Sequence, residues 1–309
     1  MQNKSAVILW LYHTDLADEF IELLKPHEKY IDIFLGLCHD NDNNEAELLF
    51  RKNFANNLSV TYLNNGGTDI LPTLNLLEKC YKYPYLFKLH SKKNNWGMNR
   101  QVNWRVLLCN DILYKDNFHW TLDRLSQDHI GIVGSHSMIM RNNEYTNVSK
   151  IAEIVDIIGI DYNKLRIKSF IGGNIFAIKT KLLWPFINQP DLKNLLSKEI
   201  GLMKDDNGGT YVHSMERLFG YMAEYNNQTI CGAPCKTQII LNPTLKGHRL
   251  HLINLYNNEC YVQENPNVYG CILDDNDDYM RINWQNQNQT TIRLYKKINN
   301  KYLINYDYA

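Results

Sequence analysis

The sequence predicts an α/β protein with a mostly parallel sheet flanked by helices, followed by a small β-rich C-terminal appendage. Through the first half of the chain, apolar runs of strand length alternate with single helical segments, and strands joined in this way usually run parallel. The first of these runs is apolar throughout, which is typical of a buried strand. After about Asn242 the chain is rich in Tyr, Ile, Thr and Asn with closely spaced turn signals, which favours antiparallel strands.

Each early strand of the predicted sheet is followed by a helical segment. Residues 6–12 form the first predicted strand, and residues 14–26 carry apolar side chains at helical spacing. The alternation continues with strands at 30–38, 58–63 and 85–90, a polar loop that leads into a helix at 39–54, and a helix at 70–82. Later segments predict a helix at 103–113, a strand at 129–135, a strand pair or a strand and helix at 169–186, and a loop and helix at 206–225.

Length, charge and cysteine content limit the classes of protein. A chain of 309 residues has room for one large domain, or one domain with an appendage. The 33 basic residues balance the 33 acidic ones, so an overall field that would attract nucleic acid is excluded and an anionic ligand must meet local positive charge. No apolar run is long enough to span a membrane, no signal peptide is recognisable, and seven scattered cysteines favour a reducing, cytoplasmic location.

The carboxyl ends of the first four predicted strands all lead into polar segments. These are "YHTD" with Tyr12 and His13, "CHDND", "NNGGTD" with Asp69, and "HSKKNN" with His90, Lys92 and Lys93. Ligands of α/β proteins bind at this edge of the sheet, so these loops predict a binding pocket.

The segment after residue 89 is the most informative. His90, Lys92 and Lys93 bring three possible donors to one strand end, and lysines can bind a diphosphate without a metal ion. The alternative interpretation is a solvated basic loop. "CGAPC" and "DDNDDY" lack the spacing of zinc and calcium sites, and no P-loop, Gly-x-Ser-x-Gly or dinucleotide motif occurs.

Three further segments carry candidate residues, each with a structural alternative. Asp69 follows two glycines and can accept hydrogen bonds from a base or ribose; alternatively the segment is an ordinary turn in which Thr68 or Asp69 caps the next helix. Gly172, Gly173 and Asn174 can let the backbone pass close to a sugar, or form a bulge. His213 and Glu216 lie at i and i+3 of a helix, where Glu216 is either a general base or part of a surface helix.

Taken in order, these motifs resemble the rhamnan synthesis protein F family, whose members assemble bacterial and some viral polysaccharides. The resemblance rests on six segments spread over about Val7 to Gly232: "NGGTDILP" at 65–72, "LHSKK" at 89–93, "WR" at 104–105, "IGIV" at 130–133, "GGNIF" at 172–176 and "VHSMER" at 212–217. Thr68 stands where the family usually has Arg, and Gly173 and Asn174 replace a Ser-Met-like pair.

The resemblance implies a glycosyltransferase domain at 1–245, GT-A-like (Rossmann-like) in layout, and an appendage at 246–309. It further implies a nucleotide-diphosphate sugar donor, with rhamnose or another deoxyhexose suggested by the family's name, and a glycan acceptor. Where common GT-A enzymes hold a metal with Asp-x-Asp at the fourth strand, this chain has His90, Lys92 and Lys93. We therefore expect no metal cofactor, these three side chains at the donor diphosphate, and Glu216 as the base of an inverting transfer.

The remaining site residues follow from the loops and segments described above. Tyr12, His13 and Asp69 are expected at the nucleotide, and Gly172, Gly173, Asn174 and His213 at the sugar or acceptor. The departures at residues 68, 173 and 174 leave one alternative, a non-catalytic protein that binds nucleotide sugars or glycans. A second alternative is an interaction protein whose C-terminal β-rich region docks an assembly partner.

Overall fold

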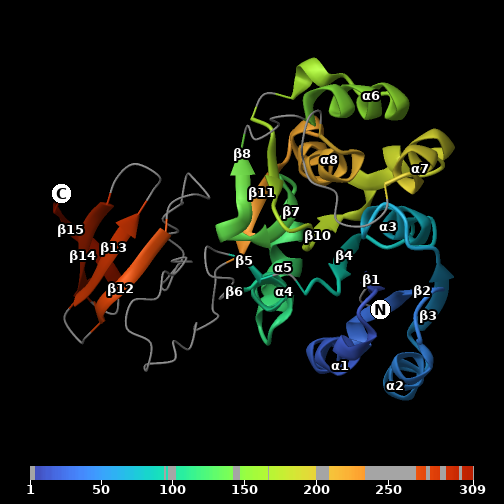
Figure 1. The fold of residues 1–309 in the computed structure, drawn as a ribbon, viewed down its shortest axis with the longest axis horizontal. Helices are drawn as coiled ribbons and strands as arrows, with labels where there is room; N and C mark the ends of the chain where they lie inside the picture. The colour runs from blue at the N-terminus through green and yellow to red at the C-terminus, as the bar shows by residue number, and fades with distance from the viewer. Residues whose placement is uncertain are drawn as a thin grey trace.

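A computed structural model describes residues 4–93, 95–96, 102–141, 147–165, 167–199, 209–233, 269–275, 279–285, 290–298 and 301–308. Its largest unit is a seven-stranded sheet with helices on both faces (Figure 1). The strands of this sheet are β1 (Ser5–Leu11), β2 (Ile31–Cys38), β3 (Leu58–Leu63), β4 (Tyr85–His90), β7 (Ile130–Ser135), β10 (Phe176–Lys179) and β11 (Thr229–Ala233). The predicted α/β class is confirmed.

The sheet has the order β11-β7-β10-β4-β1-β2-β3. Its strands are parallel except β10, which runs antiparallel to both β4 and β7. All seven residues of β1 are buried, as expected for a central strand covered on both faces. In the register of β1 and β4, Trp10 lies opposite His90, so the polar ends of these two strands meet at one edge.

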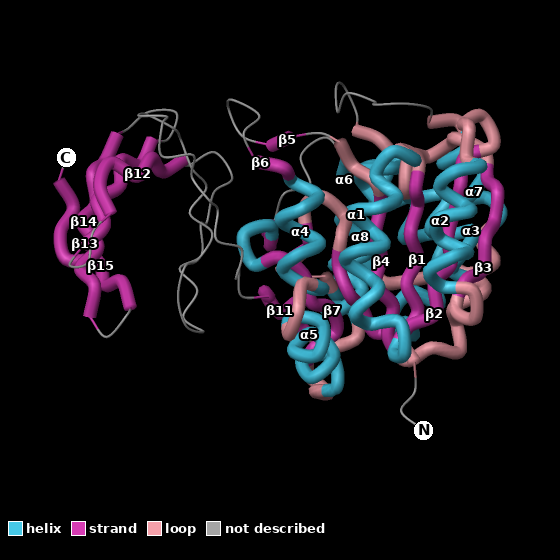
Figure 2. The backbone as a smooth tube through the Cα atoms, turned by 90° about the horizontal axis from the view of Figure 1, so that it is seen from below, coloured by secondary structure: helices cyan, strands magenta, loops and turns pink. Residues whose placement is uncertain are grey.

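The helices form two layers (Figure 1). One layer contains α1 (Ala17–Leu24), α2 (Asn44–Phe54), α4 (Trp104–Leu113) and α5 (Asn117–Ser126). The other contains α3 (Ile70–Leu77), α6 (Val148–Ile158), α7 (Pro190–Ser197) and α8 (Tyr211–Tyr225). Figure 1 shows the strands between the two layers, and Figure 2 looks onto the sheet from below, with helices overlapping its strands. Apolar side chains from both layers and the sheet form one buried core, which fixes the strand ends that carry the polar loops.

Short elements fill the connections. They are the strands β5 (Asn95–Trp96), β6 (Val102–Asn103), β8 (Ile139–Arg141) and β9 (Ser169–Ile171), and the 3-10 helices Thr14–Leu16, Lys25–Tyr30, His136–Met138, Tyr162–Lys164 and Thr180–Phe186. The segment at 169–186 is thus two strands and a 3-10 helix. β9 pairs with β8, whereas β10 joins the large sheet, so the chain turns sharply at Gly172–Asn174 between them.

The C-terminal region is β-rich, as the sequence predicts. The strands β12 (Tyr269–Asp275), β13 (Tyr279–Gln285), β14 (Thr290–Ile298) and β15 (Lys301–Tyr308) pair in that order, and each is antiparallel to the next. The predicted boundary at residue 245 lies outside the described residues and stays a prediction. Within the described ranges, no helix has both the length and the apolar character needed to cross a bilayer.

Candidate functional site

A cavity of about 360 Å³ lies at the carboxyl ends of β1 and β4, beside the loop after β3. Its lining comes from segments far apart in the chain: Trp10, Tyr12, His13, Asn65, Thr68, Asp69, His90, Ser91, Lys92, Lys93, Asn174, Thr210, Val212, His213 and Glu216. Every site residue predicted from the sequence lines this cavity except Gly172 and Gly173, which belong to the turn before Asn174. The fold therefore brings the predicted residues together.

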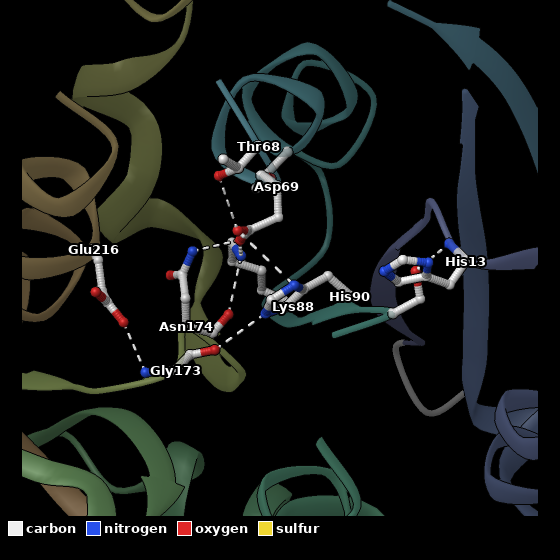
Figure 3. A network of polar contacts seen from close by, with 10 residues as sticks. His13, Thr68, Asp69, Lys88, His90, Gly173, Asn174 and Glu216 are labelled. Carbon is white, nitrogen blue, oxygen red and sulfur yellow. Dashed lines mark hydrogen bonds and ion pairs between the residues drawn. The ribbon is translucent and has the colours of Figure 1, made fainter. Parts of the chain in front are cut away.

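The inner wall is organised around the ion pair of Lys88 and Asp69 (Figure 3). Lys88 is fully buried on β4, and its Nζ lies 2.5 Å from Asp69 Oδ2. The same ammonium donates to the Asn174 carbonyl at 3.0 Å, and Asn174 Nδ2 donates to Asp69 Oδ2 at 2.5 Å. Three separate segments, β4, the loop after β3 and the turn before β10, are thus joined at one carboxylate.

The charges of this pair depend on each other. Burial alone would raise the pKa of Asp69, but attraction to His90, which is protonated in the acid range where Asp69 titrates, and to Lys88 holds that pKa below its ordinary value. Burial lowers the pKa of Lys88, and attraction to Asp69 opposes that shift. Asp69 occupies the N-cap position of α3, yet its side chain makes no capping hydrogen bond. The side chain is instead held by Lys88 and Asn174, so the predicted N-cap position is confirmed, although the side chain does not cap the helix.

His90 is a buried neutral imidazole in this wall. Its Nε2 lies 3.1 Å from the Gly173 carbonyl, which can only accept, so Nε2 carries the proton. Its Nδ1 lies 3.9 Å from Asp69 Oδ1. Burial lowers the pKa of His90 to about 4, so the ring is uncharged near neutral pH. An uncharged His90 can contact a phosphate only through a hydrogen bond, and its expected place at the donor diphosphate stays a prediction.

Glu216 is held at the opposite side of the cavity by the same turn. Its Oε1 accepts a hydrogen bond from the Gly173 N–H at 2.7 Å (Figure 3). Helix α8 can pack closely on β9, which leads into this turn, because Gly220, one helical turn after Glu216, has no side chain. A Cβ at Gly220 would lie 2.3 Å from the Phe170 Cα. α8 is largely buried, so the alternative of a surface helix is wrong.

The N-terminus of α8 also lines the cavity and is firmly capped. Thr210 Oγ1 accepts from the His213 N–H at 3.0 Å, and it lies 2.8 Å from His213 Nδ1. The buried carboxylate of Glu199 accepts from the Tyr211 and Val212 N–H groups at 2.8 and 2.9 Å. These contacts satisfy backbone donors that a helix start leaves open, and they fix His213 and Glu216 relative to the sheet.

Lys92 and Lys93 form the basic edge of the cavity. Lys92 is half-buried, whereas Lys93 is exposed and its Nζ lies 2.6 Å from the exposed carboxylate of Asp15. This exposed pair contributes little to the stability of the fold. Lys93 lines the cavity although its ammonium is paired with Asp15. The alternative of a solvated basic loop is correct in that Lys93 is exposed to solvent, but both lysines also line the cavity.

Two further contacts fix the backbone that carries these lysines. The His13 N–H donates to Ser91 Oγ at 2.8 Å, which joins the ends of β1 and β4. Arg105 is buried on α4, donates to the Lys92 carbonyl, and pairs with both oxygens of Glu19 at 2.8 and 2.6 Å. The Trp-Arg motif of the sequence thus contributes an arginine that holds the basic edge.

Two pairs of consecutive residues near Asp69 have a left-handed backbone conformation: one pair precedes it in the loop after β3, and the other lies in the turn before β10. Gly67 and Thr68 have φ of 60° and 51°, and Gly173 and Asn174 have φ of 86° and 59°. Asparagine tolerates this region, but a β-branched threonine rarely adopts it. Strain of this kind is concentrated at functional sites. The bend expected at Gly173 is present, and it also shapes the cavity.

Lys88 is the main site residue that sequence reasoning missed, although a signal was present. It is the charged residue within the apolar strand "YLFKLH", two positions before His90, and therefore on the same face of the sheet. Ser91 and Arg105 are not assigned a role from the sequence, because their contacts with His13 and Glu19 join residues far apart in the chain. Thr210 is also not assigned one, although its contact with the His213 N–H is local.

The side chains that line the cavity place positive charge and hydrogen-bond acceptors at different positions. Lysines lie at the outer edge, and carboxylates with an amide lie along the inner wall, which suits a ligand with an anionic part and a neutral polar part. In the described part of the chain, no group of three or more His, Cys, Asp or Glu side chains is arranged to hold a metal ion. The expectation of a metal-free site stays a prediction.

Comparisons with known proteins agree with the motifs. The sequence profile of a family described as "Rhamnan synthesis protein F" matches residues 1–228. No curated protein matches the chain. Among solved structures, the chain is similar to "Mannosyltransferase PcManGT from Pyrobaculum calidifontis in complex with GDP-Man and Mn2+", with 14% identity and a TM-score of 0.38. The match covers 75% of this chain and 55% of that one, so this chain spans about half of that mannosyltransferase.

Proposed function

Because the chain belongs to the rhamnan synthesis protein F family, we propose that it is a glycosyltransferase. Its donor is a nucleotide-diphosphate sugar, with rhamnose or another deoxyhexose as the first sugars to test, and its acceptor is a glycan or glycoconjugate. The observation that supports this proposal best is the single cavity in which Lys92 and Lys93 lie at one edge and Glu216 at another.

The basic edge takes the diphosphate in this proposal. Lys92 and Lys93 supply fixed positive charge where the leaving nucleoside diphosphate gains negative charge. The carboxylate of Asp69, which lines the same cavity, is already neutralised by Lys88, so it is a poor metal ligand. We therefore propose transfer without a divalent metal. Trp10 and Tyr12 add aromatic faces on which a base or sugar can pack.

Glu216 takes the role of general base. The acceptor hydroxyl oxygen bonds to the anomeric carbon, the bond from that carbon to the diphosphate oxygen breaks, and the hydroxyl proton passes to Glu216. This is one inverting displacement, and the diphosphate leaves with the electron pair of the broken bond. The Gly173 N–H holds Glu216 Oε1, which leaves Oε2 for the acceptor hydroxyl.

Binding of nucleoside diphosphates in the presence of a chelator tests the donor site. We expect UDP, GDP or dTDP to raise the Tm of the wild-type chain in EDTA, because a ligand that binds the folded state stabilises it. The Lys92→Ala/Lys93→Ala variant should lose that shift. A shift that appears only after Mn²⁺ is added would contradict the metal-free site, and no shift under either condition would contradict the donor site. Binding without transfer to any glycan acceptor would support the non-catalytic alternative.

A further inference from the structure

The inner wall of the cavity presents hydrogen-bond acceptors to a ligand. The carboxylate of Asp69 stays ionised beside Lys88, and His90 Nδ1 carries a lone pair because Nε2 holds the proton. Glu216 adds a second carboxylate on the far side. The donors of this wall are already used within the protein, since Lys88 donates to Asp69 and to the Asn174 carbonyl.

Asn174 adds the observation that indicates a missing partner. The residue is 5% exposed, and its Oδ1 is buried without a hydrogen-bond partner among the described residues. Its Nδ2 is occupied by Asp69, so the amide orientation is fixed. Figure 3 shows the Asn174 amide oxygen turned away from Asp69, toward the side of Glu216. An unpaired buried amide oxygen is costly, so a donor supplied by a ligand or water would stabilise it.

We propose that this acceptor wall, formed by Asp69, His90 and Asn174, binds the hydroxyl-bearing sugar of the donor and selects neutral sugars over uronates. The inference rests on the proposed function and deepens it. The ring hydroxyls, which a hexose and its uronate share, donate to these acceptors, so the selection acts on the group at C6. The carboxylate of a uronate at that position has no proton to donate and would face acceptors only, whereas the C6 group of a neutral sugar carries no charge. The diphosphate is then directed to Lys92 and Lys93, and His90 belongs to the sugar end of the cavity.

Neighbouring charges strengthen this selection. Asp69 and Lys88 cancel each other, so the wall offers no net positive charge to a uronate carboxylate. Glu216 adds a further negative group. A site built of hydrogen-bond acceptors discriminates strongly against a ligand that leaves them unpaired. The loss of binding free energy for a uronate is therefore larger than the loss from one missing hydrogen bond.

Calorimetry with matched ligands tests the proposal on the wild-type chain. The probes are UDP, GDP and dTDP, each alone, as the glucose or mannose conjugate, and as the corresponding uronate conjugate. For the nucleotide that binds, we expect the hexose conjugate to bind about tenfold or more tightly than the uronate conjugate. Equal or tighter binding of the uronate would overturn the proposal. Failure of all three nucleoside diphosphates to bind would instead contradict the proposed function itself.

Two variants separate the two ends of the cavity. Asn174→Gly keeps the left-handed backbone that glycine tolerates and removes the amide. It should weaken the hexose conjugate about tenfold and leave the free nucleoside diphosphate unchanged. Lys92→Ala should weaken both ligands. An Asn174→Gly variant that loses both ligands equally would place Asn174 at the diphosphate and overturn the proposal. If that variant does not fold, the wild-type comparison of hexose with uronate decides alone.

Discussion

Lys88 Nζ lies 2.5 Å from Asp69 Oδ2, with the lysine side chain fully buried and the aspartate side chain 13% exposed. The two residues come from β4 and from the loop after β3, and the Asn174 carbonyl takes a second hydrogen bond from the same ammonium. A buried charge of this kind is maintained by its partner, because removing one member leaves the other without compensation. The pair therefore holds three cavity segments together.

Replacing Lys88 by methionine should lower the free energy of unfolding by about 3–5 kcal/mol, because Asp69 loses its counter-charge. Urea unfolding measures the change. The matched control is Lys193→Met, since Lys193 Nζ lies 2.5 Å from Glu78 in a partly exposed pair, where the expected loss is below about 1 kcal/mol. The Lys88→Met/Asp69→Asn variant should recover part of the loss. Equal losses for Lys88→Met and Lys193→Met would contradict this account.

Thr68 stores backbone strain beside the cavity, at φ of 51°. Thr68→Gly and Thr68→Val both remove the hydroxyl, but only glycine adopts this conformation without strain. We expect the glycine variant to be more stable than the valine variant by about 1 kcal/mol. Thermal unfolding of both variants checks the difference, and a valine variant as stable as the glycine variant would show that the threonine is unstrained.

Arg105 is a positioning residue for the basic edge. Lysine at this position cannot pair with both oxygens of Glu19 and also donate to the Lys92 carbonyl, because it lacks the planar fork of arginine. We expect Arg105→Lys to weaken binding of the nucleoside diphosphate by about tenfold at a temperature where the variant is folded. Glu19→Gln, which keeps the Lys92 contact, should bind nearly as the wild type does. Unchanged affinity in Arg105→Lys would contradict the positioning role.

His90 should make stability depend on pH. The unfolded side chain takes up a proton below its ordinary pKa of 6.5, whereas the folded one does so only near pH 4. Between these values the unfolded state binds more protons, so acidification lowers the free energy of unfolding, on the order of 3 kcal/mol over the window. Asp69 adds a further loss at lower pH, because its folded pKa is below the ordinary value.

Urea unfolding of wild type and His90→Gln at pH 4 to 7 isolates this contribution. The buried His27 also has a pKa lowered by burial, and it remains in both proteins, so the difference between them reports His90. The wild type should lose stability more steeply than the variant as the pH falls. Parallel pH profiles would show that His90 is not buried as a neutral ring.

The sequence was sufficient to predict the sheet and most cavity residues, for a physical reason. Parallel strands place their carboxyl ends at one edge, so Tyr12, Asp69 and His90 had to converge once the strands were recognised. The charge state of His90 was not predictable in this way, because it depends on burial and on the Gly173 carbonyl, a contact 83 residues away in the chain. The Lys88–Asp69 pair likewise required the tertiary structure.

The central claim is that this cavity transfers a sugar with Glu216 as the base. The most direct measurement is the rate of nucleoside diphosphate release from a nucleotide sugar, in the presence of a glycan acceptor, for wild type and Glu216→Gln. We expect the variant to be about 10²–10⁴-fold slower while it binds the donor with unchanged affinity. A Glu216→Gln variant that releases nucleoside diphosphate at the wild-type rate would contradict the claim.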